Sequence, residues 1–286
     1  MFFITSKIKA LSLSSFSNIN LPHLRKYIMV DFIKLYLGTT RRLAYTFTTS
    51  FFNPTERKRL MDLYNVYNHQ DPHAFPIDPY IIPKTDVLEI NGNDKAIYEG
   101  VDECGFGHIT EFELKVICQI IQKYQPQRIF EIGTFEGRTT LNIALNAPNA
   151  QIFTLDLPAA DLGNTKMQIE KTEEAYVKKT QSGGRFLNHP AKKNIQQLFG
   201  DSATFDFSPY YNSIDLMFVD GSHAYEYVLS DTDRALKLVK KGGIILWHDY
   251  TNWEGVRDAL NEFYKNDPLF KGVKHIGGTS IVMLQV

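Results

Sequence analysis

The sequence of 286 residues contains only two cysteines and no long hydrophobic run. Cys104 and Cys118 form no Cys-x-x-Cys motif and no ligand spacing with histidine, which argues against a disulfide scaffold or a zinc site and indicates a reducing compartment. Apolar runs such as 244–247 are far shorter than the roughly 18 residues that cross a bilayer, so no stable membrane insertion is expected. Internal repeats and low-complexity segments are also absent. With 43% hydrophobic and 22% charged residues, the composition is typical of a globular protein.

Acidic residues are missing from the first thirty positions. Residues 1–60 hold ten Lys and Arg but only two acids, so the rest of the chain is acidic overall. That part has no basic groove signature, which argues against nucleic acid as a partner. The serine-rich, acid-free leader shares its bias with organelle transit peptides, but Met29 would make an ordinary start. We expect a cytoplasmic protein, with organelle targeting by residues 1–28 as the weaker alternative.

The N-terminal and C-terminal parts of the chain differ in the secondary structure that their sequence patterns predict. Residues 31–48 and 54–68 read as helices, and the stretch 71–80 carries Pro72, Pro76 and Pro79, which favours an extended linker. The pattern predicts an N-terminal region of leader, helices and linker over 1–104 and a second domain over 105–286. Whether the protein forms a homo-oligomer is left open.

The second part alternates apolar runs of strand length with helical patterns, which indicates a parallel sheet. The runs are nearly continuous in apolar residues, as expected for strands covered on both faces. A helix over 225–239, another over about 253–265, and a terminal hairpin of 272–276 and 280–284 complete the pattern. We therefore expect an α/β, Rossmann-like fold with a C-terminal antiparallel hairpin and five parallel strands at 128–131, 151–156, 195–199, 214–220 and 243–247.

The first predicted strand runs into a glycine turn and a helix. The order is Glu131-x-Gly133-x-x-x-Gly137 rather than the Gly-x-Gly-x-x-Gly of dinucleotide sites, so a pyrophosphate would lack its close backbone approach. A carboxylate beside such a turn suits a ligand that presents a cation, such as the α-ammonium of S-adenosylmethionine. Asp156 ends the second strand nineteen residues after Gly137, where an acid can accept both hydroxyls of a ribose.

On these motifs, residues 105–286 resemble a class I S-adenosylmethionine-dependent methyltransferase. The resemblance implies that Glu131, Gly133, Thr134 and Gly137 surround the methionine portion of the cofactor and that Asp156 holds its ribose. It also implies that Asp201 and Ser202, after the third strand, border the adenine, and that Asp220 joins the cofactor-binding set. Asp201 could equally cap a helix over 203–207.

Two neighbouring strand ends, Phe218 to His223 and Trp247 to Tyr250, aim carboxylates into the same crevice. The pattern resembles the metal-dependent O-methyltransferases of the catechol and macrolide-sugar type. Carried over, the resemblance makes Asp220, Asp249 and His248 the metal ligands. Oxygen ligands favour Mg²⁺, although the His248-Asp249 pair departs from the acid pair or Asp-Asn pair of the relatives and leaves the third ligand open.

His223 stands three residues after Asp220, close to the general base of those relatives. Together with Asp220 it forms the predicted catalytic pair, because a histidine that titrates near neutrality can take a proton from an acceptor hydroxyl. Alternatively, His223 only caps a helix or bonds a carboxylate.

The remaining histidines have no ligand spacing and are expected on the surface or in loops. Phe106, Trp247, Tyr250 and Trp253 are either walls of the acceptor pocket or core residues.

The sequence thus predicts an enzyme that transfers a methyl group from S-adenosylmethionine to a hydroxyl of a small molecule, with a divalent metal and a histidine base. Two alternatives stay open, because a fold does not fix a function. One is a non-methylating, hydroxylase-type enzyme on the same scaffold. The other is a catalytically inactive protein that retains the cofactor pocket.

Overall fold

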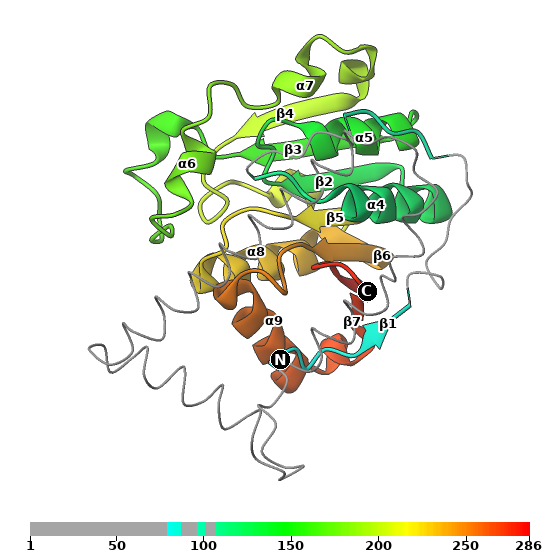
Figure 1. Cartoon of the computed structure of the whole chain (residues 1–286), viewed down its shortest axis with the longest axis vertical. Helices are drawn as coiled ribbons and strands as arrows, with labels where there is room; N and C mark the ends of the chain where they lie inside the picture. Colours follow the sequence, from blue (N-terminus) through cyan, green and yellow to red (C-terminus); the bar gives the residue numbers. More distant parts are fainter. Residues whose placement is uncertain (1–78, 87–95, 101–106) are drawn as a thin grey trace, which may run out of the picture. The chain divides into compact units, whose positions relative to one another are not determined.

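A computed structural model describes residues 79–86, 96–100 and 107–286, which contain one eight-stranded sheet (Figure 1). The order of the strands across the sheet is β1-β7-β8-β6-β5-β2-β3-β4. Their bounds are β1 Lys84–Thr85, β2 Arg128–Ile132, β3 Gln151–Asp156, β4 Ile195–Phe199, β5 Ile214–Val219, β6 Val239–Trp247, β7 Lys274–Ile276 and β8 Val282–Gln285.

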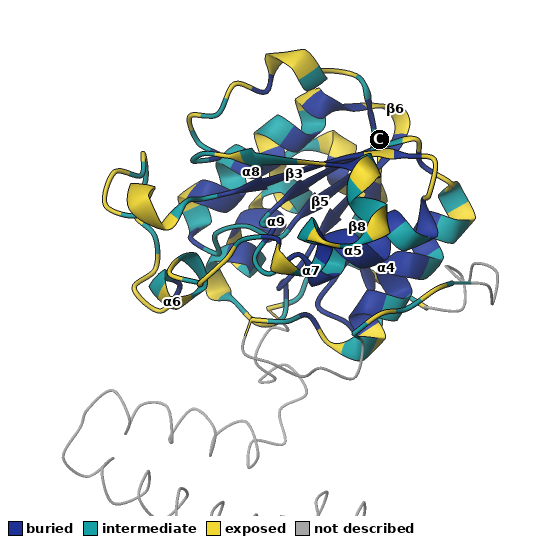
Figure 2. Ribbon diagram, turned by 90° about the horizontal axis from the view of Figure 1, so that it is seen from above, coloured by how far each residue is buried: buried dark blue, intermediate teal, exposed yellow. Residues whose placement is uncertain are grey.

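Helices cover both faces of the sheet. Side chains of α4 and α5 belong to one buried hydrophobic cluster, and side chains of α8 and α9 belong to the other. The described α-helices are α4 Glu111–Tyr124, α5 Arg138–Asn146, α6 Glu174–Val177, α7 Gly184–Leu187, α8 Tyr225–Leu238 and α9 Glu254–Asn266. The buried strands run between the two helical layers (Figure 2).

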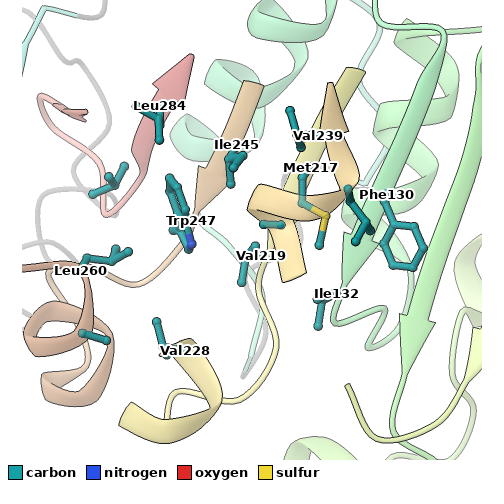
Figure 3. Packing of buried hydrophobic residues seen from close by; sticks show 14 of the residues in the cluster. Phe130, Ile132, Met217, Val219, Val228, Val239, Ile245, Trp247, Leu260 and Leu284 are labelled. Carbon is teal, nitrogen blue, oxygen red and sulfur yellow. The ribbon is translucent and has the colours of Figure 1, made fainter. Parts of the chain in front are cut away.

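The parallel core of the sheet follows from its continuous apolar strands. Neighbouring residues point to opposite faces, so Ile129 packs into one cluster and Phe130 into the other. Strands β6, β5, β2, β3 and β4 pair in parallel, which confirms the five predicted strands. The cluster under α8 and α9 includes Met217, Ile245 and Trp247 (Figure 3). Because the five strands run the same way, their carboxyl ends meet at one edge.

The C-terminal hairpin is also confirmed, since β8 pairs antiparallel with both β6 and β7. The sequence did not predict β1, whose two residues pair in parallel with β7. A strand of two residues leaves no periodic pattern to detect.

Three local predictions can be compared with the structure. The helix before β6 ends at Leu238, so Val239, placed by the sequence on the helix face, begins the strand instead. His275 is buried in β7, where its Nε2 lies 2.7 Å from the carbonyl of Thr279, so the expectation of a surface or loop histidine was wrong there. The spacing of Thr110 and Glu113, three residues apart before an apolar helical pattern, predicts a capping box, and the structure has this capping box at the start of α4.

The predicted helices at 31–48 and 54–68, most of the proline linker, and Phe106 lie outside the described residues. The boundary at 104/105 remains a prediction. In the described ranges, no helix has the length and apolar character needed to cross a membrane.

Candidate active site

A cavity of about 350 Å³ opens at the carboxyl ends of the parallel strands. It brings together most of the residues that the sequence singled out, although they come from separate strands. The predicted site residues that line it are Gly133, Asp156, Asp201, Ser202, Asp220, His223, His248 and Asp249. Thr134 and Gly137 line a smaller adjoining space with Gly133 and Asp220, and Glu131 lines neither.

Gly133 lets two strand-end turns approach closely. Its φ is +98°, and a Cβ built there would lie 1.8 Å from the carbonyl oxygen of Asp220. Any side chain at this position would therefore separate the turn after β2 from the turn after β5. Gly137 is similarly constrained, with a φ of +83° and the ring of Phe186 2.6 Å from the Cβ position. The two glycines thus leave room for the backbone of Asp220 and for the ring of Phe186, respectively.

Glu131 lies within β2 and is fully buried. Thr140 and Thr154 each donate a hydrogen bond of 2.5 Å to its Oε2, whereas its Oε1 has no hydrogen-bond partner among the described residues. Burial raises the pKa of the Glu131 carboxyl to about 8, against the donors, so it is mostly a neutral acid at pH 7. This arrangement gives no support to the expectation of a carboxylate facing the cofactor's ammonium, and the role assigned to Glu131 stays a prediction.

Asp156 lies in the cavity wall at the end of β3. The ammonium of Lys179, from the connection between β3 and β4, lies 2.7 Å from its Oδ2. The backbone N–H of Phe135 donates to its Oδ1 over 3.4 Å. Sequence reasoning missed Lys179, because no periodicity or motif distinguishes it from the other lysines of that connection.

Asp201 is held by three donors: the backbone N–H groups of Lys166 and Ala203, at 2.6 and 2.9 Å, and the Tyr227 hydroxyl, at 2.9 Å. The structure has turns rather than a helix at 203–207, so Asp201 caps a turn and not the helix that the sequence offered as an alternative. It still lines the cavity beside Ser202. The two readings of Asp201, turn cap and cavity wall, are compatible.

His248 sits among three carboxylates at the end of β6. Its Nδ1 lies 3.2 Å from Oδ1 of Asp220 and 3.1 Å from Oδ2 of Asp249, and its Nε2 lies 3.4 Å from Oε2 of Glu113. Burial alone would lower the pKa of His248, but the carboxylates raise it well above its usual value. For Glu113 the balance is opposite: burial would raise its pKa, yet bonds from His248 and Ser280 hold it low. The sequence predicted Glu113 as a helix-capping residue and missed this second contact.

His223 is held on three sides. Its Nε2 lies 2.8 Å from Oδ2 of Asp249, its Nδ1 lies 2.5 Å from Oε1 of Glu173, and the Trp253 ring stacks on it at 4.4 Å and 5°. Burial would lower the pKa of His223, but the two carboxylates raise it to about 9. The predicted contact of His223 with a carboxylate is therefore present, and the imidazole carries a proton at neutral pH.

Trp253 lines the cavity, whereas Trp247 and Tyr250 are core residues.

The group that could hold a cation differs from the predicted one. Candidate ligand atoms of Asp220, His223 and Asp249 all lie within 4.8 Å of one another, so this set contains His223 where the sequence placed His248. Two carboxylates and one imidazole fit a divalent cation, although an imidazole ligand suits Mn²⁺, Fe²⁺ or Zn²⁺ better than Mg²⁺.

Known proteins share this scaffold. A family model described as "Methyltransferase domain" matches residues 130–250. "Uncharacterized protein R132" of Acanthamoeba polyphaga mimivirus is 34% identical over 165 residues, which cover 56% of this chain and 67% of that protein. The structure of the O-methyltransferase NovP aligns with a TM-score of 0.50 at 14% identity, over 62% of this chain and 80% of that one. Cofactor-bound Rv0187 from MTB aligns with a TM-score of 0.43 at 17% identity, over 82% and 97% of the two chains.

The matched residues 130–250 contain most of the cavity described above. They run from β2 through the turn after β6 and so include Gly133, Asp156, Asp220, His223 and Asp249. At 14% identity, the likeness to NovP shows the fold alone. Fold, glycine turn and matched domain agree: residues 130–250 carry a methyltransferase domain on the scaffold of the class I S-adenosylmethionine-dependent methyltransferases.

Proposed function

We propose that this protein transfers the methyl group of S-adenosylmethionine to a hydroxyl of a small molecule. The observation that carries the proposal is that one cavity is lined both by Asp156, at the end of β3, and by the group of Asp220, His223 and Asp249, at the ends of β5 and β6. The first provides a hydrogen-bond acceptor for a ribose, and the second provides groups that handle a proton and a charge.

The half of the cavity that we assign to the cofactor lets a ligand approach the backbone closely. Gly133 leaves the turn after β2 without a side chain, and Asp156 presents its carboxylate from the neighbouring strand. A ribose bound there would donate its hydroxyls to Asp156, as an acid at the end of a second strand does in dinucleotide sites. Asp201 and Ser202, which follow β4, extend the same wall and are our candidates for the adenine border.

The other half prepares the acceptor hydroxyl. A hydroxyl becomes a competent nucleophile as its proton leaves, and His223 is the candidate to take that proton at Nε2. Since its pKa is raised to about 9, only the neutral fraction of His223 can act as a base, and that fraction grows as the pH rises. Asp249, 2.8 Å from the same nitrogen, stabilises the imidazolium that results.

The same carboxylates fit a divalent cation. Asp220 and Asp249, with His223 within reach, would hold it, and an ion bound there would favour the alkoxide form of the acceptor. Mg²⁺ is our first candidate because two carboxylates suit it and leave His223 free to act as the base. Mn²⁺ is the alternative if His223 is itself a ligand, in which case His223 would not take the proton and the ion alone would favour the alkoxide.

The test is an incubation of the purified protein with S-adenosylmethionine and a panel of small hydroxylated molecules, in Mg²⁺, in Mn²⁺ and in excess chelator. We expect S-adenosylhomocysteine and an acceptor heavier by one methylene group in equal amounts, with no turnover in chelator. If turnover is the same with and without chelator, the proposal that the reaction needs a divalent cation is wrong. Methylation of nitrogen or carbon acceptors alone would overturn the hydroxyl assignment.

A further inference from the structure

Glu173 is a buried acid in the connection between β3 and β4, just before α6, and is 3% exposed. It lies 50 residues from His223 in the sequence, yet its side chain reaches the turn after β5. The sequence reasoning assigned it no role. A carboxylate that is so deeply buried is costly unless it is well bonded, which makes its partners informative.

Both oxygens of Glu173 are engaged. Its Oε1 accepts from the backbone N–H of His223 and faces the His223 Nδ1, each at 2.5 Å. Its Oε2 accepts from the Ser222 hydroxyl at 3.0 Å and from the backbone N–H of Glu170 at 2.9 Å. Three of these four contacts go to two consecutive residues of the turn that carries His223. The carboxylate therefore binds the imidazole and its backbone together.

These contacts decide the direction of the imidazole ring. Glu173 fixes Nδ1, and Trp253 covers one face of the ring at 4.4 Å and nearly parallel. With one nitrogen and one face held, Nε2 points toward Asp249, 2.8 Å away, on the side of the cavity that also contains Asp220. Without Glu173, the ring could turn about its two side-chain torsions, and Nε2 would lose its fixed direction.

We propose that Glu173 is a positioning residue that orients the His223 imidazole so that Nε2 faces the acceptor side of the cavity. The inference rests on the proposed function, since it assigns a role to a residue that acts through the proposed base. It also assigns a function to the connection between β3 and β4. That segment contributes Tyr176 and Val177 to the cavity wall, so it both lines the cavity and holds the proposed base.

The test compares Glu173→Gln with Glu174→Gln in the full-length protein. Gln keeps the size of the side chain but loses the charge and offers only one acceptor oxygen, so it cannot keep all four contacts. Glu174 is the matched control, because it is the next residue and its exposed side chain pairs with the exposed Lys178 rather than with His223. We expect Glu173→Gln to lower kcat by roughly ten- to a hundredfold, with acceptor KM and S-adenosylhomocysteine affinity within about twofold of wild type. Glu174→Gln should change none of these values.

A double-mutant cycle separates positioning from a purely structural role. If Glu173 acts through His223, Glu173→Gln causes no further loss of kcat in a His223→Gln background. Equal losses in both backgrounds would overturn the proposal, and so would wild-type kcat in Glu173→Gln. Should Glu173→Gln fail to fold, Ser222→Ala with Glu173→Asp provides a milder weakening of the same contacts, with the same expectation.

The ring nitrogens of His223 supply a readout that needs no acceptor. In protein labelled with ¹⁵N-histidine, Glu173→Gln should shift the Nδ1 resonance of His223, which Glu174→Gln leaves in place. If the wild-type protein methylates no acceptor but this shift occurs, the proposed function fails while the contact stands. If the wild type is active and neither the shift nor kcat changes in Glu173→Gln, the positioning role is wrong and the proposed function survives.

Discussion

The ammonium of Lys179 lies 2.7 Å from the carboxylate of Asp156, and both side chains are less than a tenth exposed. Lys179 thus contacts the acid that we assign to the cofactor ribose. A carboxylate can accept several hydrogen bonds, so Lys179 and a ribose can share Asp156. The pair links cofactor affinity to local stability, and the two effects can be measured separately.

Replacing Asp156 with Ala should weaken S-adenosylhomocysteine binding by roughly tenfold or more, about 1.4 kcal/mol, because the ribose hydroxyls lose their acceptor. The variant also leaves the buried Lys179 without its carboxylate partner, with only the carbonyl of Tyr176 within hydrogen-bond distance among the described residues, at a cost of about 3 kcal/mol in the free energy of unfolding. Calorimetric titration gives the affinity, and thermal unfolding gives the stability.

Two controls separate these effects. Asp161→Ala, at an exposed acid of the same connection, should leave both quantities unchanged. The double variant Asp156→Ala with Lys179→Met should recover stability without recovering affinity. Wild-type affinity in Asp156→Ala would show that the ribose assignment is wrong.

Glu131 gives a second prediction. Because its carboxyl is mostly neutral at pH 7, Glu131→Gln should bind S-adenosylhomocysteine within about threefold of wild type. Glu131→Ala, which removes the acceptor of two buried hydroxyls, should lower the melting temperature markedly. If Glu131 instead bound the cofactor's ammonium as a carboxylate, Glu131→Gln would lower affinity tenfold or more, which calorimetry would detect.

The candidate cation site is best tested with Asn. Asp249 has a φ of +66°, a conformation that Asn tolerates better than Ala does, so Asp249→Asn removes the charge without added backbone strain. Asp249→Asn and Asp220→Asn should each lower Mn²⁺ affinity and metal-dependent turnover by roughly ten- to a hundredfold, and Asp249→Asn should preserve cofactor affinity. Electron paramagnetic resonance of free Mn²⁺ measures the binding.

The exposed Asp258 of α9 provides the control, since Asp258→Asn should bind Mn²⁺ as wild type does. Equal Mn²⁺ affinity in all three variants and wild type would refute the cation site.

The charge on His223 gives a pH prediction for the metal-free protein. Its folded pKa of about 9 lies above the usual 6.5, so the stabilisation by Asp249 and Glu173 is fully present below pH 6.5 and is lost as the pH rises through 9. The stability difference between wild type and His223→Gln should therefore shrink over this range, by on the order of 3 kcal/mol. Denaturant unfolding in chelator at each pH measures it, and a constant difference would contradict the assigned protonation.

The sequence predicted the parts of the site that lie on strand ends. Continuous apolar runs identify parallel strands, and the residue after such a run lies at the carboxyl edge of the sheet, which placed Asp156, Asp220 and Asp249 together. Gly133 was predicted as a turn residue, and the structure adds the reason, because the backbone of Asp220 occupies the space of a side chain.

The sequence could not predict Glu173 and Lys179. Both lie in a connection that contains only short helices, where no periodicity fixes which side chains turn inward. Their partners are distant in sequence, 50 residues away for the contact of Glu173 with His223. The sequence also suggested a charged Glu131 carboxylate beside the cofactor's ammonium. Burial raises the pKa of Glu131, and the motif alone does not reveal that burial.

The measurement that tests the central claim most directly is calorimetric titration of the purified full-length protein with S-adenosylhomocysteine. The account predicts binding of one equivalent with micromolar affinity, with and without chelator, because Asp156, which we assign to the ribose, is not a member of the candidate cation site. No detectable binding to a folded sample under either condition would contradict the assignment of the cavity to a methyl-donor cofactor.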